Sequence, residues 1–311
     1  MAEGLLNQMP FVNPFSEPGT WLRGNTHAHS TRSDGEVSPE ARFAGYREAG
    51  YDFLVLTDHD VTGAVEQFCT DGFLAIPGAE LHPENPYGGD RYHILALNFL
   101  EPIDARAMHV REVLEAIQAG GGIAVMAHPY WSGHQLSDYE PLRGLYHGLE
   151  VFNYGASFLN GTANAELIWD AHLDRLGSTF GFAADDAHRA DADVGGAWIM
   201  VRAEKRDIAS VMTAIRRGAF YATQGPSVTA LTGVRDGDRV RIEVRCTPAA
   251  AVRFKGRTFS GRWQGASDGG LLEHAVYECR GNEKYIRVEI IDALGHKAWT
   301  NPIYLSDILG S

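Results

Sequence analysis

The sequence predicts an α/β protein, a closed or distorted (β/α) barrel followed by a small antiparallel β module. Across residues 21–225, short apolar runs alternate with helical patterns, which is typical of parallel strands joined by helical crossovers. Ligand-type residues recur at the carboxyl ends of these runs, an arrangement that a barrel explains better than an open sheet. Beyond residue 226 the helical patterns stop and an alternation of apolar and polar residues begins.

Residues 21–27 are expected to form the first strand, and Ser38 with Pro39 marks the start of a helix over residues 39–49. His27 and His29 lie where this strand ends, and Asp34 lies in the loop that follows. Because strand residues two apart project to the same face, the two histidines are placed to bind one cation from one side.

The second strand, residues 52–57, is a near-continuous apolar run of the kind found in buried parallel sheets, and it delivers Asp58-His59-Asp60 at its carboxyl end. A lone His-x-His is commonly a surface accident, but chance does not explain ligand-type residues at successive strand ends. The later examples are Glu80 at the close of run 73–80, His93 in the next run, His128 after run 122–127, and Asp186 and His188 after run 178–184.

Further helices are expected over residues 104–119, 163–176 and 208–217, and a strand over 148–153 brings Glu150 and Asn153 to the same rim. Alternating runs at 239–245 and 285–291, with a hairpin turn at Asp236-Gly237-Asp238, predict the antiparallel module. The expected organisation is an N-terminal extension (1–20), a barrel (21–225) and a small β-sandwich-like module (226–311). We expect the module to serve packing or contact within a homo-oligomer rather than substrate recognition.

Composition and charge limit the possible location and binding partners of the protein. The amino terminus lacks a basic region followed by an apolar core, and no run approaches the roughly 18 apolar residues of a membrane span, so we expect a cytoplasmic protein without a membrane partner. The three cysteines, Cys69, Cys246 and Cys279, are far apart and are expected to be inert reduced thiols, with a Cys246–Cys279 disulfide as the alternative. The net charge of −13 argues against a general nucleic-acid-binding surface.

The motifs together resemble the PHP (polymerase and histidinol phosphatase) superfamily of metallohydrolases over about residues 20–225, and the segments 21–29 and 221–226 are similar to its carbaryl-hydrolase-like branch. The resemblance implies a distorted (β/α)7 barrel. It also implies three metal positions that share Glu80: a first held by His27, His29, Glu80 and Asp186, a second by Asp34, His59 and His188, and a third by Glu80, His93 and His128.

Imidazole and carboxylate ligands suit two to three divalent transition-metal ions, whether Mn, Zn or Fe. Cations about 3.5 to 4 Å apart share a water and lower its pKa, so the expected reaction is hydrolysis by a metal-bridging hydroxide, with no side chain assigned as catalytic. Three carboxylates, three such cations and a hydroxide leave a local charge of about +2, which favours a small anionic phosphomonoester or phosphodiester. The alternatives are hydrolysis of a carboxylic ester, amide or carbamate, and non-catalytic metal binding.

Some neighbouring residues have two interpretations. Asp186 fits the Asp-x-His pattern better than Asp185 does, and Asp58 and Asp60 are expected to orient His59 or to cap a helix. Glu150 and Asn153 are placed to contact substrate or the ligating histidines. Arg32, His134 and Arg189 are candidates to contact a phosphate or to protonate a leaving group, with a solvated loop position as the alternative, and His82 is a candidate proton donor. Structural or surface roles are expected for the other histidines: His109, His147, His172, His274 and His296.

Overall fold

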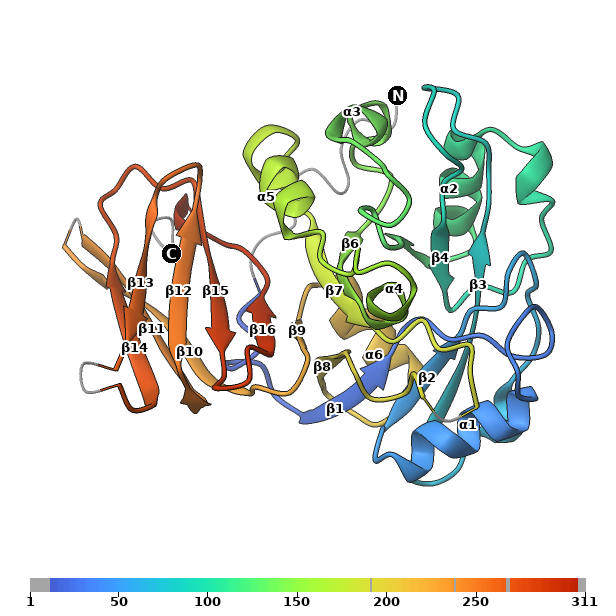
Figure 1. The fold of residues 1–311 in the computed structure, drawn as a ribbon, viewed down its shortest axis with the longest axis horizontal. Coiled ribbons are helices and arrows are strands. Elements are labelled where there is room, and N and C mark those ends of the chain that lie inside the picture. The colour runs from blue at the N-terminus through green and yellow to red at the C-terminus, as the bar shows by residue number, and fades with distance from the viewer. Residues whose placement is uncertain (1–11, 191, 238, 267–268, 307–311) are drawn as a thin grey trace.

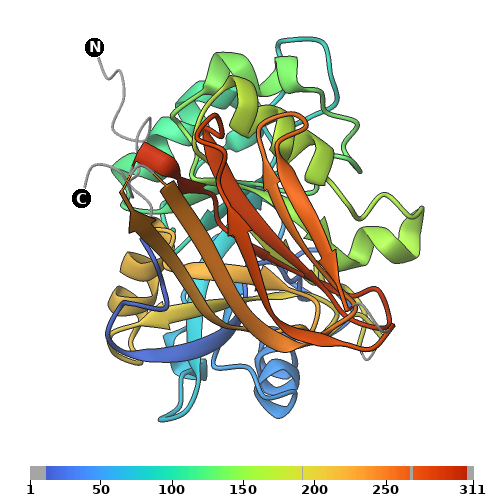
Figure 2. The same ribbon diagram turned by 90° about the vertical axis from the view of Figure 1, so that its left-hand side faces the viewer.

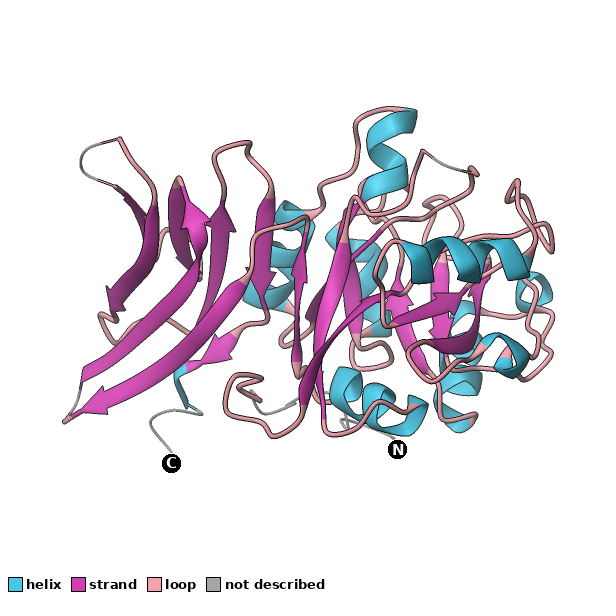
Figure 3. Cartoon of the chain, turned by 90° about the horizontal axis from the view of Figure 1, so that it is seen from below, coloured by secondary structure: helices cyan, strands magenta, loops and turns pink. Residues whose placement is uncertain are grey.

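The structure is a computed structural model that describes residues 12–190, 192–237, 239–266 and 269–306. The N-terminal part carries helices α1 to α6, and a module built mainly of strands lies at one end of the long axis (Figures 1 and 3). Residues 1–11 of the predicted extension and Asp238 of the predicted hairpin turn lie outside the described residues. None of the described helices is long and apolar enough to cross a membrane.

The N-terminal part is built on one mixed sheet. Three parallel strands come first: β1 (Thr20–Asn25), β2 (Phe53–Leu56) and β3 (Leu74–Leu81). Helix α1 (Pro39–Glu48) joins β1 to β2, and the Ser38 side chain caps it by accepting from the Ala41 amide. All four side chains of β2 are buried, as its apolar run predicts.

The sheet continues through β4 (Ile94–Leu97), which is antiparallel to both β3 and β5 (Ile123–Met126). Helix α2 (Val110–Ala119) precedes β5, and β6 (Gly148–Asn153) and β7 (Phe180–Ala184) follow it in parallel. On the other side of β1 lie two antiparallel strands, β8 (Trp198–Ala203) and β9 (Phe220–Thr223), separated by α6 (Ile208–Arg216).

The predicted (β/α)7 barrel is not confirmed, because the sheet does not close. Among the described residues β7 pairs only with β6, and the N-terminal part contributes nine strands of mixed direction. No α-helix connects β3 to β4, so β4 returns antiparallel instead of crossing over. The gap beside β7 is bridged by Asn301, whose Oδ1 accepts from the Gly181 amide of β7 at 3.0 Å and whose Nδ2 donates to the carbonyl of Phe220 in β9 at 3.0 Å.

The C-terminal module consists of two antiparallel groups of strands (Figure 2). One is the sheet of β10 (Val228–Asp236), β11 (Arg239–Ala249) and β14 (Leu272–Glu278). The other contains β12 (Ala251–Gly256), β13 (Gly261–Gly265), β15 (Tyr285–Ile291), β16 (Lys297–Thr300) and β17 (Ile303–Tyr304). Because β16 pairs with β9, this group continues the N-terminal sheet across the predicted boundary at residue 225, and the domain limits stay a prediction.

The three cysteines are free thiols, so the alternative of a disulfide between Cys246 and Cys279 is not present in the structure.

A buried ion-pair network joins the module to helix α5 (Glu166–Arg175). Arg287 of β15 is fully buried; its Nη2 lies 2.7 Å from Asp170 Oδ1 and its Nη1 lies 2.7 Å from Glu289 Oε1. Its guanidinium also lies 4.6 Å from the Trp169 ring centroid. Removing this cation would take the nearest positive charge from the fully buried Glu289, which would keep only the longer contacts to Lys255 Nζ at 3.4 Å and to Arg253 Nη1 at 3.7 Å.

We therefore expect Arg287→Ala to lower the free energy of unfolding by about 3 to 5 kcal/mol in urea titrations. Arg253→Ala is the matched control, because Arg253 lies 3.7 Å from the same Glu289 but its side chain is 47% exposed. An exposed pair of this kind contributes about 1 kcal/mol or less. Equal losses in the two variants would contradict the role of burial.

Candidate metal centre

The nine predicted ligands meet at one end of the N-terminal sheet. His27 and His29 follow β1, where a bridge from Ala28 to Ala187 keeps the segment extended, so the two side chains face the same side although β1 itself ends at Asn25. Five more lie at or beyond the carboxyl ends of β2, β3, β5 and β7: His59, Glu80, His128, Asp186 and His188. His93 precedes β4, and because β4 is antiparallel to its neighbours its amino end lies at this same edge.

Glu80 is the centre of the cluster and is fully buried. Its Oε1 lies 2.8 Å from His93 Nδ1 and 3.1 Å from His128 Nε2, while its Oε2 lies 2.9 Å from His59 Nδ1. Burial opposes ionisation of this carboxyl, but the surrounding histidines, His27 foremost, outweigh burial and hold its pKa well below the usual range. One carboxylate is therefore shared among the histidines of several strands.

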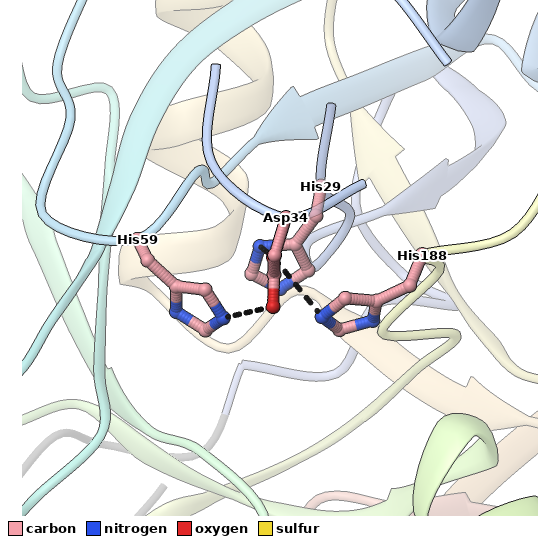
Figure 4. A group of neighbouring side chains, drawn as sticks. All are labelled: His29, Asp34, His59 and His188. Carbon is pink, nitrogen blue, oxygen red and sulfur yellow. Dashed lines mark ion pairs between the residues drawn. The ribbon is translucent and has the colours of Figure 1, made fainter. Parts of the chain in front are cut away.

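A second group forms around Asp34, on the open side of the cluster (Figure 4). Asp34 Oδ2 lies 3.3 Å from His59 Nε2, and its Oδ1 lies 3.5 Å from His188 Nε2 and 3.8 Å from His29 Nδ1. His29 thus faces this group with Nδ1 and faces Asp186 with Nε2, at 3.0 Å. The family resemblance placed His29 with the first metal alone, whereas the geometry places it between two groups.

The donor atoms of these residues suit divalent cations. Ligand atoms lie within 4.8 Å of one another in several sets: His29, Asp34, His59 and His188; His27, His29 and Glu80; His27, His128 and Asp186; and Glu80, His93 and His128. His27 Nε2, His29 Nδ1 and Glu80 Oε2 are buried without a hydrogen-bond partner among the described residues. Carboxylate oxygens lie 3.2 and 3.4 Å from His27 Nε2 without being aligned for a hydrogen bond. Buried polar atoms normally have partners, and a cation is the partner that mixed nitrogen and oxygen donors fit.

Other side chains hold the cluster in place. Glu150 Oε1 lies 2.8 Å from His27 Nδ1, and its Oε2 accepts from the His128 amide at 2.9 Å and from Asn153 Nδ2 at 2.9 Å. Asn153 Nδ2 also donates to Asp186 Oδ2 at 3.2 Å. Both residues therefore contact the cluster itself, one of the two roles that the sequence left open for them.

The adjacent aspartates divide as the sequence indicated. Asp186 faces the histidines, whereas the buried Asp185 accepts hydrogen bonds from the amides of Gly195, Gly196 and Ala197, from Asn25, and from the hydroxyls of Tyr46 and Tyr51. Asp58 accepts from the Ser30 amide and hydroxyl and so organises the loop before Asp34. Three of the described non-glycine residues with positive φ lie here, Asp60, His128 and Asp186, so the backbone is strained at the cluster.

The remaining candidate residues differ in whether they lie near the cluster. Arg32 donates to the Ala64 carbonyl, buried His134 contacts Tyr139 Oη and the Asp90 carbonyl, and neither residue is part of the described lining of the cavity. Arg189 lines the cavity described next, and His82 contacts the cluster directly. The five histidines expected to be structural or on the surface lie away from it: His109 caps α2, His147 and His172 are buried in the fold, and His274 and His296 are 42% and 47% exposed at the side chain.

A cavity of about 380 Å³ opens over the cluster. Seven of the predicted ligands form its floor, and Trp131, Phe158 and Leu159 form an apolar wall. The Trp131 ring packs edge-on against His128, with centroids 4.8 Å apart. Arg189 is the one arginine or lysine in the described lining. The sequence does not predict this wall: Trp131 lies three residues after His128, but Phe158 and Leu159 are distant from it in the chain.

Comparison with known proteins places the fold. No family model matches the chain, and no curated protein matches it. Among solved structures, a two-domain protein from Bacteroides vulgatus containing a predicted PHP-like metal-dependent phosphoesterase is similar, with a TM-score of 0.54, 17% identity, and coverage of 92% of this chain and 93% of that one. This likeness shows that the two chains share a fold over most of their lengths.

Two other likenesses are looser, and their TM-scores below 0.5 support no argument. A putative metal-dependent phosphoesterase from Bifidobacterium adolescentis has a TM-score of 0.45 at 15% identity, covering 65% of this chain and 98% of that one. An amidohydrolase from Chromobacterium violaceum has a TM-score of 0.40 at 19% identity, covering 55% and 89%.

Proposed function

We propose that this protein is a PHP-type metal-dependent hydrolase that cleaves a small phosphomonoester or phosphodiester whose leaving group is apolar. The observation that supports this most is the convergence of histidine nitrogens on the buried Glu80 carboxylate, together with His27 Nε2, His29 Nδ1 and Glu80 Oε2, which are buried without a hydrogen-bond partner among the described residues. Divalent cations bound there would polarise the phosphoryl oxygens and make water a nucleophile at neutral pH. Mn, Zn and Fe all suit the donor set.

The chain's own residues fix the geometry for this chemistry. The Glu150 carboxylate can only accept, so His27 donates through Nδ1 and turns the Nε2 lone pair toward Glu80 and Asp186. Arg189, the residue after His188, lines the cavity and is the cation available to contact a phosphate oxygen.

The apolar wall defines the rest of the substrate. Trp131, Phe158 and Leu159 are 38%, 46% and 64% exposed, so they present apolar surface to whatever enters the cavity. Arg189 is the single arginine or lysine of the described lining, so few positive side chains would offset the negative charge of a polyphosphate. We therefore place the phosphate on the metal side and an aromatic or aliphatic group against Trp131.

The test is a substrate series assayed with Mn²⁺ and with Zn²⁺: p-nitrophenyl phosphate, bis-p-nitrophenyl phosphate, ethyl phosphate, nucleotides, and an aryl ester and an aryl carbamate. We expect aryl phosphates to be turned over best and chelation to abolish activity. Trp131→Ala should raise KM for p-nitrophenyl phosphate roughly fivefold, with a smaller change for ethyl phosphate, because an aromatic contact contributes about 1 kcal/mol.

Tyr130→Ala is the matched control, since Tyr130 is 53% exposed and does not line the cavity. Turnover of the carbonyl substrates alone would refute the phosphoester proposal and favour the ester, amide or carbamate alternative. Activity that survives complete removal of metal would refute metal dependence itself.

A further inference from the structure

His82 lies inside the metal centre, although the ligand set implied by the family resemblance does not include it. It stands two residues after Glu80, just beyond β3, and is 5% exposed. Its Nε2 lies 3.1 Å from His59 Nδ1, 3.1 Å from His93 Nδ1 and 3.9 Å from Glu80 Oε2. Four donor groups from three strand ends therefore surround one point.

The opposite side of the His82 ring is held by a carboxylate. Nδ1 lies 3.1 Å from Asp60 Oδ2, and the His82 amide donates to Asp60 Oδ1 at 3.0 Å. Arg106 Nε in turn donates to Asp60 Oδ2 at 2.6 Å. Asp60 adopts a φ of +53°, a left-handed conformation that aspartate tolerates better than most residues, so its carboxylate is held in place at some cost.

This arrangement decides which ring nitrogen carries the proton. An ionised carboxylate only accepts hydrogen bonds, so Nδ1 of His82 carries the hydrogen and Nε2 keeps its lone pair. That lone pair points toward two further imidazole nitrogens, each of which already lies within 2.9 Å of Glu80. A histidine whose second ring nitrogen is held by a carboxylate is the usual arrangement of a metal ligand.

The spacing of the imidazole nitrogens agrees with a shared cation, whereas Glu80 Oε2, 3.9 Å from His82 Nε2, lies somewhat farther away. Ligands about 2.0 to 2.2 Å from a metal, at tetrahedral to octahedral angles, lie roughly 2.9 to 3.5 Å apart. The separations from His82 Nε2 to its two histidine neighbours are both 3.1 Å, and His59, Glu80 and His82 form a set whose ligand atoms lie within 4.8 Å of one another.

We propose that His82 is a metal ligand of this centre, binding a divalent cation together with Glu80 and His59, and that Asp60 is the positioning residue that fixes its tautomer. The proposal rests on the proposed function only in requiring that the protein binds metal. An added imidazole makes the donor set richer in nitrogen, which favours Zn²⁺ or Fe²⁺ over Mn²⁺.

The direct test is anomalous diffraction from crystals of the full-length, zinc-loaded protein. The expected result is a metal peak within about 2.0 to 2.3 Å of His82 Nε2. A peak bound to Glu80 but lying beyond 3 Å from His82 would overturn the proposal and leave the proposed function standing. Absence of bound metal in the wild-type protein would overturn both.

Solution measurements give a second readout that does not depend on activity. His82→Ala is expected to release about one zinc ion per chain, or to weaken that ion's affinity at least tenfold in chelator competition. Asp60→Asn is expected to weaken affinity by about 10- to 100-fold, as removal of the group that orients a ligand does. If His82→Ala fails to fold, Asp60→Asn and the diffraction experiment decide.

His134→Ala is the matched control, because His134 is also a buried histidine but contacts Tyr139 Oη and the Asp90 carbonyl instead of the cluster. Its zinc content should equal that of the wild type. If His82→Ala and Asp60→Asn also keep wild-type zinc content and affinity, His82 is a hydrogen-bonding neighbour of the centre and not a ligand.

Discussion

Replacing Glu80 with glutamine is expected to remove bound metal and to lower turnover by more than about 100-fold. Glu80 is buried, and its two carboxylate oxygens lie within 3.1 Å of nitrogens of His59, His93 and His128. Glutamine keeps the shape but removes the charge and replaces one acceptor with a donor that faces these nitrogens. Changing a residue that only orients a ligand already costs about 10- to 100-fold, so loss of a shared ligand costs more.

The measurement is metal content by mass spectrometry beside kcat on the best aryl phosphate. Glu150→Gln is the matched control, because Glu150 is equally buried and contacts His27 and His128. The amide oxygen of the introduced glutamine can still accept from His27 Nδ1. It should retain most of its metal and lose less activity than Glu80→Gln. Equal metal content in the two variants would show that Glu80 is not a shared ligand.

The sequence predicted the members of the cluster because each is marked locally. A buried apolar run that is soon followed by a histidine or a carboxylate predicts both a strand and a polar group at its end. Strand β2 with His59 is an example. The structure brings all nine predicted residues together. Their roles as ligands stay a prediction, which the variants of Glu80, His82, His93 and His128 test.

Local sequence patterns could not predict the direction of β4 or the apolar wall of the cavity. Both depend on contacts between residues that are distant in sequence. The run at β4 looks like its neighbours, and only its pairing with β3 and β5 shows that it runs the other way. The edge between β7 and β9 is bridged by Asn301, which no local pattern connects to either strand. Trp131 lies in the turn after His128 and Phe158 lies in helix α4 (Tyr154–Leu159), so only the folded chain reveals the complete apolar wall.

The double variant His93→Ala, His128→Ala is expected to lose close to one metal ion per chain. His93 Nδ1 and His128 Nε2 lie 2.8 and 3.1 Å from the same oxygen of Glu80, so the three residues supply the three protein ligands typical of a catalytic metal with an open position. Burial lowers the pKa of His93 to about 4, which keeps its ring neutral at pH 7 and its lone pair available to a cation.

If that metal contacts a phosphate oxygen, its loss should reduce activity on phosphoesters more than activity on uncharged esters, because an anionic phosphoester gains more from the added positive charge than an uncharged ester does. His274→Ala, His296→Ala is the control for the same chemical change at exposed positions, and it should leave metal content and both activities unchanged. A His93, His128 variant that keeps its full metal complement would make these two histidines structural. The same conclusion would follow if both activities fell only in proportion to folded protein, and the centre would then be limited to the ligands around Asp34, Glu80 and Asp186.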